Sequence, residues 1–304
     1  MKSVCVLLST YNGEKYLREQ LDSLITQEGI KLSIVVRDDG SEDNTIGILD
    51  EYMKRDSRIT YYEGKNVGPA QSFLDLIIKS PDSDYYAFCD QDDVWDNDKL
   101  KIAVDFLEKE NQSKPNMYYS NLRIVDQTLS FYRFSHLEPL KQKTKYSVLT
   151  EDLATGCTVV FNRTTVKYVK IGIPECCSMH DTWISMICKF FGKTVYDFEA
   201  HISYRQHDNN VVGTYLDKKT KDMYIARIKR LFDRSLQPRY NNACDFYKIF
   251  AEQLNIQDRE KILKLVNYKK SFGKRLSLLF DRDIHSSSID RELRYRLLIL
   301  LGIV

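Results

Sequence analysis

Short apolar runs alternate with amphipathic segments along the first hundred residues of this 304-residue chain. Four of the runs have the length and composition of buried strands, at residues 4–8, 32–36, 59–62 and 85–89. Between them apolar residues recur at helical spacing, and Pro69 opens a helix predicted over residues 69–79. This alternation predicts an α/β fold with a Rossmann-like, mostly parallel sheet that helices cover on both faces.

The second half of the chain has a more mixed pattern. Further strands are predicted at residues 117–120, 158–161, 194–198 and 200–204, and a helix at residues 182–191. Residues 208–220 are polar and predict a loop, and helices with basic faces are expected from residue 221 onward. The sequence therefore predicts an α/β body followed by a helical C-terminal appendage.

Polar residues follow each of the four strands predicted in the first hundred residues. They are Thr10, Tyr11, Asn12, Asp38, Asp39, Asn66 and the run Asp-Gln-Asp-Asp at residues 90–93. In sheets of this kind, ligands bind beyond the carboxyl ends of the strands. We therefore expect these residues to form one site.

The acidic run at residues 90–93 is the sharpest of these signals. Three carboxylates in four residues repel one another unless a cation or a hydrogen-bond network compensates their charge. A hard divalent cation, held by one or two carboxylates and by substrate phosphate oxygens, meets that demand. The alternative is an acidic N-terminal cap on the next helix, to which Asp96 and Asp98 would contribute.

Asp38 and Asp39 precede Gly40 and Ser41, so they could simply form a turn and a helix cap. A carboxylate there could instead accept hydrogen bonds from a nucleobase or from ribose hydroxyls, and Tyr11 could stack on the base. The glycine-rich cradle of dinucleotide cofactors does not follow the first strand, and the chain contains no P-loop sequence. Dinucleotide-dependent and P-loop enzymes are therefore disfavoured.

The seven cysteines are odd in number and lack a repeating spacing, so we expect free thiols in a reducing compartment rather than a zinc ribbon or disulfides. The N-terminal residues do not have the pattern of a signal peptide, and apolar windows are too short to span a bilayer. These features predict a cytoplasmic protein.

Charge is distributed unevenly along the chain. Residues 218–304 contain 20 Lys and Arg against 10 Asp and Glu, whereas the remainder has a net charge of −8. The C-terminal helix predicted over residues 289–304 combines leucines with arginines, which is typical of helices on an anionic membrane surface. Docking of these helices on the body of the enzyme, or in a homodimer, is the alternative. Nucleic acid is disfavoured because no recognition motif accompanies the charge.

Taken together, the motifs resemble family 2 glycosyltransferases. The resemblance rests on Ser-Thr-Tyr-Asn-Gly at 9–13, Arg-Asp-Asp-Gly-Ser at 37–41, Asn-x-Gly at 66–68, Phe-Cys-Asp-Gln-Asp-Asp-Val-Trp at 88–95 and Lys-Leu at 99–100. The Asp-Gln-Asp-Asp-x-Trp form is similar to bacterial rhamnosyltransferase-type enzymes that build cell-wall, capsule and O-antigen polysaccharides. The resemblance implies a GT-A domain at 1–213, with a nucleotide-sugar half (1–100) and an acceptor half (101–213), followed by a basic helical region (214–304).

By position, the resemblance also implies roles in donor binding. Asp39 would contact the base, Tyr11 would pack on it, and Thr10, Asn12, Asp38 and Asn66 would lie nearby. Asp92 would bind Mn²⁺ or Mg²⁺, while Asp90 would bind the ribose or the metal. In the segment Arg-Gln-His at 205–207, Arg205 and His207 would hold the diphosphate or the metal.

On the acceptor side, Asp181 occupies the position of the general base of an inverting transfer. A helix N-cap is the alternative for this residue. His180, Gly156, Cys157 and Trp183 would line the acceptor site, although Trp183 could equally be a core aromatic residue.

The resemblance implies transfer of L-rhamnose from dTDP-rhamnose to a growing, lipid-linked glycan at the inner face of the bacterial membrane. A UDP-hexose is the alternative donor. Two other classes stay open: a catalytically inactive nucleotide-sugar-binding protein, and a nucleotidyltransferase, which would release pyrophosphate.

Overall fold

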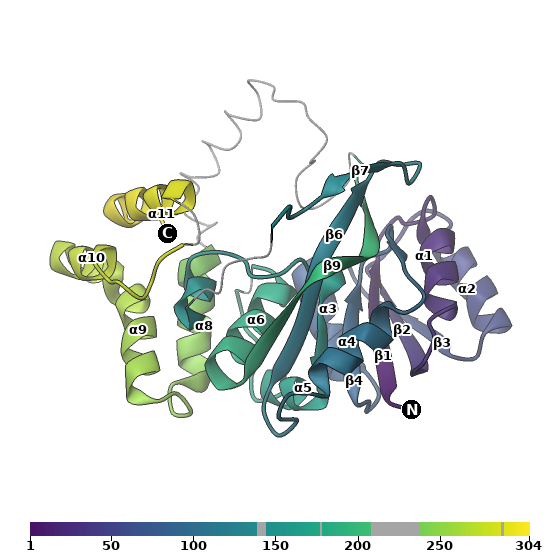
Figure 1. Cartoon of the computed structure of the whole chain (residues 1–304), viewed down its shortest axis with the longest axis horizontal. Coiled ribbons are helices and arrows are strands. Elements are labelled where there is room, and N and C mark those ends of the chain that lie inside the picture. The colour runs from purple at the N-terminus through teal and green to yellow at the C-terminus, as the bar shows by residue number, and fades with distance from the viewer. Residues whose placement is uncertain (139–143, 177, 208–237, 287–288) are drawn as a thin grey trace.

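A computed structural model describes residues 1–138, 144–176, 178–207, 238–286 and 289–304 (Figure 1). Its strands are β1 (Ser3–Thr10), β2 (Lys31–Asp38), β3 (Ile59–Glu63), β4 (Tyr85–Cys89), β5 (Val94–Trp95), β6 (Asn116–Val125), β7 (Phe131–Phe134), β8 (Val160–Asn162) and β9 (Lys193–Arg205). Its α-helices are α1 (Leu17–Ile25), α2 (Thr45–Arg55), α3 (Pro69–Lys79), α4 (Lys99–Leu107), α5 (Arg163–Val169), α6 (His180–Phe191), α8 (Pro238–Phe250), α9 (Ile256–Asn267), α10 (Phe272–Leu279) and α11 (Ile289–Leu301). Three short 3-10 helices are η1 (Lys145–Leu149), η2 (Gly156–Thr158) and η3 (Tyr268–Lys270).

The described strands form one sheet in the order β3-β2-β1-β4-β8-β6-β9-β5, with β7 paired to β6. The four strands predicted in the first hundred residues are confirmed, and β3, β2, β1 and β4 lie parallel. The other half of the sheet is mixed rather than purely parallel. There β6 and β9 are parallel to each other, whereas β8 runs antiparallel to both β4 and β6.

One correction concerns the end of the sheet. The two strands predicted at residues 194–198 and 200–204 are one strand, β9, which pairs in parallel with β6. The register shifts beside Ser120 and Asn121 of β6, and such an irregularity lets one strand continue where the pairing slips. β9 therefore extends without interruption to Arg205, which brings the segment 205–207 to the acidic run.

Both faces of the parallel half are buried. Successive residues of β1 point to opposite faces, so Val4, Val6 and Leu8 join one apolar cluster while Cys5 and Leu7 join the other. Apolar residues of α1, α2 and α4 complete the first cluster, and those of α3, α5 and α6 the second. A sheet buried on both sides leaves the ends of its strands as the place for polar chemistry.

The C-terminal helices continue the second cluster. The ring of Trp183 on α6 lies 5.5 Å from that of Phe246 and 6.1 Å from that of Phe250, both on α8. Figure 1 shows α9, α10 and α11 at the end of the molecule remote from α1 and α2. The predicted helical region is thus present in the described residues, while the boundary at 213/214 and the predicted loop at 208–220 lie outside them.

Two expectations from composition can also be compared with the structure. Each of the six described cysteines is a free thiol, as predicted. Within the described part of the chain, no helix is both long enough and apolar enough to cross a membrane.

Candidate active site

The loops after β1, β2 and β4 meet at one end of the sheet and are joined by hydrogen bonds. The hydroxyl of Thr10 donates to Asp38 at 2.9 Å, and the backbone N–H of Glu42 donates to the side-chain oxygen of Asn12 at 2.9 Å. Gln91 exchanges two hydrogen bonds with the backbone of Tyr11, at 2.8 and 3.0 Å. The polar strand ends predicted to converge therefore form one connected surface.

Asp38 and Asp39 are buried, and protein donors occupy both carboxylates. Asp38 accepts from the backbone N–H groups of Gly40 (3.0 Å) and Ser41 (2.8 Å). Asp39 is ion-paired with buried Arg37 and accepts from the backbone N–H of Gly68 at 2.9 Å. Both residues thus shape the loops of this end of the sheet, and base contact by Asp39 stays a prediction.

Tyr11, Asn12 and Asn66 are exposed members of the donor set. The side chain of Tyr11 is 47% exposed, so its ring has a free surface on which a base could stack. Asn66 is exposed and its backbone N–H lies beside Gly40. Gly40 has a φ of +83°, a left-handed conformation that glycine adopts at low cost.

Asp92 and His207 come together although they are 115 residues apart in sequence. The Nε2 atom of His207 lies 2.6 Å from Oδ2 of Asp92, and its ring packs at 5.1 Å from that of Tyr16. At this separation the two groups share a hydrogen bond, and each is of a type that could instead bind a cation held between them. These are two of the three metal ligands predicted from sequence.

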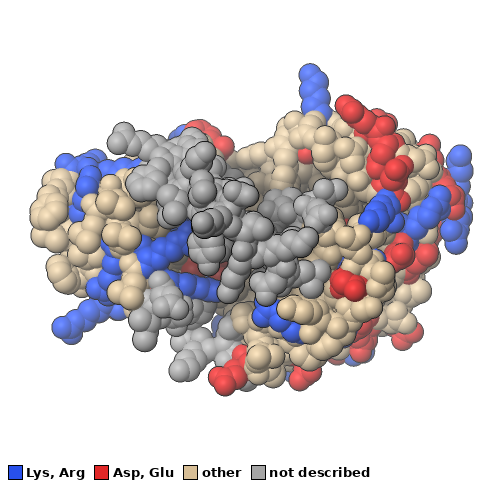
Figure 2. Space-filling view, turned by 90° about the horizontal axis from the view of Figure 1, so that it is seen from above, with Lys and Arg blue, Asp and Glu red and all other residues tan. Residues whose placement is uncertain are grey.

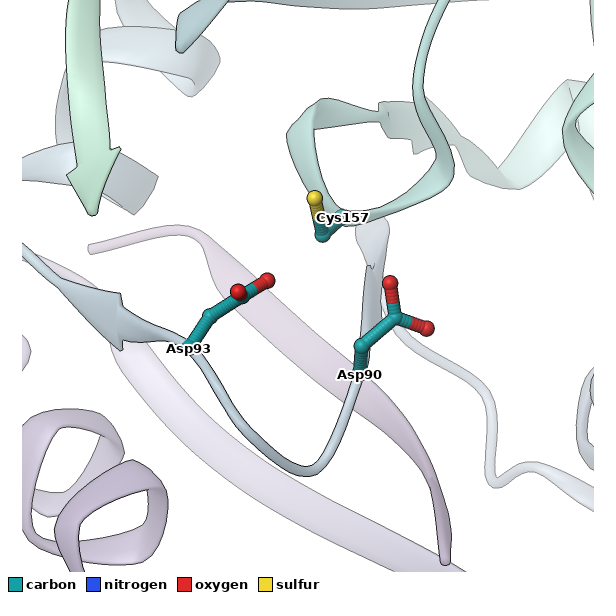
Figure 3. Close-up of side chains that lie close together, drawn as sticks. All are labelled: Asp90, Asp93 and Cys157. Atoms are coloured by element: carbon teal, nitrogen blue, oxygen red, sulfur yellow. The ribbon is translucent and has the colours of Figure 1, made fainter. Parts of the chain in front are cut away.

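The third predicted ligand, Asp90, belongs to a crowded group of acidic side chains (Figure 3). Ligand atoms of Asp90, Asp93 and Cys157 lie within 4.8 Å of one another. Burial, then the charges of Asp92 and Asp181, raise the pKa of Asp90 to about 7. Burial and the neighbouring carboxylates likewise hold the pKa of Asp93 well above its usual range. A divalent cation at this loop would relieve the repulsion, so the residues present fit a metal.

Lys99 supplies positive charge beneath the acidic run. Its side chain is fully buried, with Nζ 3.1 Å from the centre of the Trp95 ring, and it has no hydrogen-bond partner among the described residues. Burial lowers the pKa of Lys99 to about 8, against the pull of nearby acidic groups that include Asp93 and Asp90. Part of the acidic charge is therefore balanced by the protein itself.

Arg205 holds the acidic run in place through hydrogen bonds. Its guanidinium donates to the backbone oxygens of Asp92 (2.8 Å) and Gln127 (2.6 Å) and to the carboxylate of Glu19 (2.5 Å). Its own backbone N–H donates to Asp93 at 3.0 Å. The structure thus corrects the expected direct contact with the donor, because this buried side chain is directed at the protein's own oxygens.

Asp181 lies in the first turn of α6, close enough to raise the pKa of Asp90. Its side chain is buried, and Oδ1 accepts from the backbone N–H of Thr182 at 2.6 Å. Burial, then the charge of Asp152, raise the pKa of Asp181 to about 7. A carboxyl group with this pKa can take up a proton near neutral pH, as a general base must.

His180 and Gly156 pack beside Asp181. The His180 ring stacks on Phe73 at 3.9 Å and meets Phe88 edge-on at 4.4 Å, and burial lowers its pKa to about 3, so it is neutral. A side chain at position 156 would come within 2.8 Å of Nε2 of His180. Glycine is therefore required for the close approach of η2 to α6.

Two predicted acceptor residues are not on the surface of the site. Trp183 is fully buried against α8, so the core-aromatic alternative describes its position. Cys157 is also fully buried and lies next to Asp90 and Asp93 (Figure 3), and burial raises the pKa of its thiol well above the usual value. Both residues were predicted to line the acceptor site, and both are corrected for the same reason. An apolar or weakly polar side chain close to a site often packs in the core instead of on the surface of the site.

Sequence reasoning gave no role to Gln91, Lys99, Arg37 or Asp152. One feature of the sequence could have pointed to Lys99. It stands in the Lys-Leu pair after the acidic run, at a position where a helix usually begins to bury apolar residues. Asp152 accepts from Thr182 (2.7 Å) and from both terminal nitrogens of Arg239 (2.9 and 2.8 Å). Its proximity to Asp181 depends on tertiary structure.

Comparison with known proteins places the chain in a family. The sequence profile of a family described as Glycosyl transferase family 2 matches residues 5–164, more than half of the chain. A relative from Shigella flexneri, dTDP-rhamnosyl transferase RfbG, is 30% identical over 252 residues, which are 78% of this chain and 84% of RfbG.

Solved structures show the same fold at low sequence identity. S. aureus TarS 1-349 in complex with UDP has a TM-score of 0.57 at 16% identity, covering 96% of this chain and 78% of TarS 1-349. Mannosyltransferase PcManGT from Pyrobaculum calidifontis, in complex with GDP-Man and Mn²⁺, has a TM-score of 0.53 at 17% identity, covering 100% and 81% of the two chains. The chain therefore belongs to Glycosyl transferase family 2 and has the GT-A fold of a glycosyltransferase.

Proposed function

We propose that this enzyme is an inverting, metal-dependent glycosyltransferase that moves a sugar from a nucleoside diphosphate to a glycan acceptor. The observation that carries the proposal is the meeting of Asp92 and His207, 2.6 Å apart, beside Asp90 and near the buried carboxyl of Asp181. Such a transfer needs a cation site and a general base. Asp92, His207 and Asp90 could supply the first, and a carboxyl group with a pKa near 7 could act as the second.

The proposed donor is dTDP-L-rhamnose. The support is the similarity to RfbG, which is named a dTDP-rhamnosyl transferase and is covered over most of its length. The Asp-Gln-Asp-Asp-x-Trp sequence at residues 90–95 supports the same choice. A UDP-hexose is the second donor to test, since the sugar pocket is not determined by these residues.

In the proposed reaction, Asp181 accepts the proton of the acceptor hydroxyl while that oxygen attacks the anomeric carbon. Attack comes from the face opposite the departing diphosphate, which inverts the configuration. Asp92, His207 and Asp90 would hold Mn²⁺ or Mg²⁺, which offsets the negative charge of the leaving diphosphate. Tyr11 supplies the exposed ring on which the base would stack.

The proposed acceptor is a growing, lipid-linked cell-surface glycan, and the enzyme would act as a peripheral protein at the inner face of the bacterial membrane. Support comes from the relationship to RfbG and from the basic C-terminal helices. His180 and Gly156 would then lie on the acceptor side of the site, next to Asp181.

A donor panel tests the proposal. The protein is incubated with Mn²⁺ or Mg²⁺ and with dTDP-rhamnose, UDP-galactose, UDP-glucose or UDP-N-acetylglucosamine, with and without a lipid-linked acceptor extract. We expect metal-dependent release of dTDP from dTDP-rhamnose. Asp92→Asn should lower turnover by 100-fold or more, roughly the cost of removing one preorganised charge-stabilising group.

Asp105→Asn is the matched control, because the Asp105 side chain on α4 is 57% exposed and belongs to no group of possible cation ligands among the described residues. Release from a UDP-hexose alone would replace the donor. Donor binding without release in any condition would favour the inactive binding protein, and release of pyrophosphate would favour a nucleotidyltransferase.

A further inference from the structure

Helix α11 is apolar on two opposite faces. Tyr295 and Ile299 are buried in the core shared with α6 and α8, whereas four leucines of the same helix are largely exposed. The exposed leucines are Leu293 (63%), Leu297 (56%), Leu300 (42%) and Leu301 (51%). A helix turns by about 100° per residue, so the four leucines fall within an arc of roughly 100° around the helix axis. The centre of that arc is about 190° from the two buried residues, on the opposite side of the helix. We call these four residues the outer leucine face.

Arginines border the outer leucine face on both sides. Arg294 follows one edge at about 20° and is exposed, while Arg296 lies at about 40° from the other edge and is half-buried beside Glu292. Among the residues that the structure describes from 268 to 304, exposed basic side chains predominate, and the half-exposed carboxylate of Asp283 is ion-paired with Lys261. The surface around the leucines is thus apolar and positively charged.

Helix α10 carries a similar surface. Phe272 (66% exposed) and Phe280 (70% exposed) lie on the side opposite the buried Leu278. The guanidinium of Arg275 donates to the backbone oxygen of Leu300 at 3.2 Å and joins the two helices. Figure 1 shows α10 and α11 close together at one end of the molecule, and Figure 2 shows that Lys and Arg outnumber Asp and Glu on the visible part of that end.

A group of exposed, large apolar side chains such as this one indicates a binding surface, because soluble proteins rarely leave such patches uncovered. In an interface with a second copy, the core of the patch is depleted of charge over a broad area. Here the apolar stripe is narrow, and one arginine stands beside each of its edges. Leucine and phenylalanine on one side with basic residues at the border is the pattern of a helix lying in a membrane surface.

We propose that the outer leucine face, together with Phe272 and Phe280, inserts into the surface of an anionic lipid bilayer. Tyr295 and Ile299 hold α11 on the enzyme, so the helix is already formed before it meets the membrane. Basic residues such as Lys274, Arg282 and Arg294 attract anionic headgroups, and the leucines enter the boundary between headgroups and acyl chains. This inference does not depend on the sugar transferred.

The test is flotation of the full chain with vesicles of phosphatidylcholine alone or with 40% phosphatidylglycerol. We expect binding to the anionic vesicles that weakens as salt is raised, and little binding to phosphatidylcholine alone. The double variant Leu293→Ser/Leu297→Ser should lose at least 10-fold in partition coefficient. Ile256→Ser is the matched control, since Ile256 is 78% exposed on α9 and outside the proposed surface; it should bind like the wild type.

Circular dichroism and thermal unfolding of both variants check the fold, and because the substituted side chains are exposed we expect both variants to match the wild type. Equal binding of the double variant and the wild type would overturn the proposal, as would absence of binding to anionic vesicles. Light scattering without lipid measures the oligomeric state. If the wild type is a dimer and the double variant is a monomer, the surface is an interface with a second copy and the membrane proposal is wrong. Vesicle binding needs neither donor nor acceptor, so its failure is distinguishable from failure of the proposed reaction.

Discussion

At the scale of single residues, the site is defined by how the protein balances four carboxyl groups. Asp90 and Asp181 both have a pKa raised to about 7, and burial is the largest cause in each case. Asp92 instead faces His207, and Asp93 is buried above Lys99. Each carboxyl group therefore has a different environment, which is how one cluster can supply both a cation site and a base.

The first prediction concerns the pH dependence of turnover. Asp181 can act as a base only when ionised, so kcat should rise with pH through about 7 and fall about tenfold for each unit below that midpoint. Asp152→Asn removes a negative charge that raises the pKa of Asp181, and it leaves Arg239 without its partner. Both effects favour the ionised form, so the midpoint should move to lower pH.

The measurement is a kcat profile between pH 5 and 9 at saturating donor and metal. Asp181→Asn serves as the reference, with no pH-dependent turnover but intact donor binding. A midpoint that stays in place or moves upward in Asp152→Asn would refute the link between the two carboxyl groups.

At the scale of elements, most of the strands and helices that build the site follow from local patterns in the sequence. The helix predicted over residues 69–79 matches α3, because Pro69 fixes the first turn and apolar residues recur at helical spacing. Strand β4 matches the run at residues 85–89 for the same kind of reason. The carboxyl ends of β1, β2 and β4 then place Thr10, Asp38 and the acidic run together, as predicted.

What local patterns could not give is the direction in which the functional side chains point. Two of the acceptors of Arg205 are backbone oxygens, of Asp92 and Gln127, and backbone groups leave no signature in a sequence. The apolar face of α6 is equally compatible with a pocket or with a core, so Trp183 could not be assigned. The continuity of β9 depends on a register shift against β6, which is a tertiary feature.

The second prediction tests the supporting role of Arg205 at the end of β9. Arg205→Lys keeps the charge but cannot reach three acceptors at once, and each lost hydrogen bond to a charged group costs about 1.5–3 kcal/mol. We expect a lower melting temperature and a several-fold weaker apparent affinity for Mn²⁺, measured by thermal unfolding and by metal titration.

Arg163→Lys is the control, because Arg163 lies on α5 with 43% of its side chain exposed. If Arg205→Lys bound Mn²⁺ like the wild type, the guanidinium would not be what positions the acidic run.

At the scale of the whole molecule, one apolar cluster extends from β1 through α6 to the C-terminal helices. The catalytic end and the helical end therefore share a core, although α10 and α11 lie far from α1. A shared core favours cooperative unfolding, since neither part keeps its buried surface without the other.

The third prediction follows from that core. Phe250→Ala removes a fully buried ring that packs on Trp183, which typically costs about 3–5 kcal/mol. Thermal unfolding followed by tryptophan fluorescence and by far-UV circular dichroism should give one coincident transition in the wild type, and one at lower temperature in the variant. Two separate transitions would show that the C-terminal helices fold independently.

Gln91 has a consequence for how the enzyme responds to its ligands. Its side chain holds the backbone of Tyr11 through two hydrogen bonds, so the loop that would carry the base and the loop that would carry the cation form one unit. A ligand that orders one of these loops therefore also orders the other loop before the second ligand binds. Nucleotide and cation should then strengthen each other's binding by the same factor, as thermodynamic linkage requires. Occupancy of the site should therefore be higher when nucleotide and cation are supplied together than when either is supplied alone.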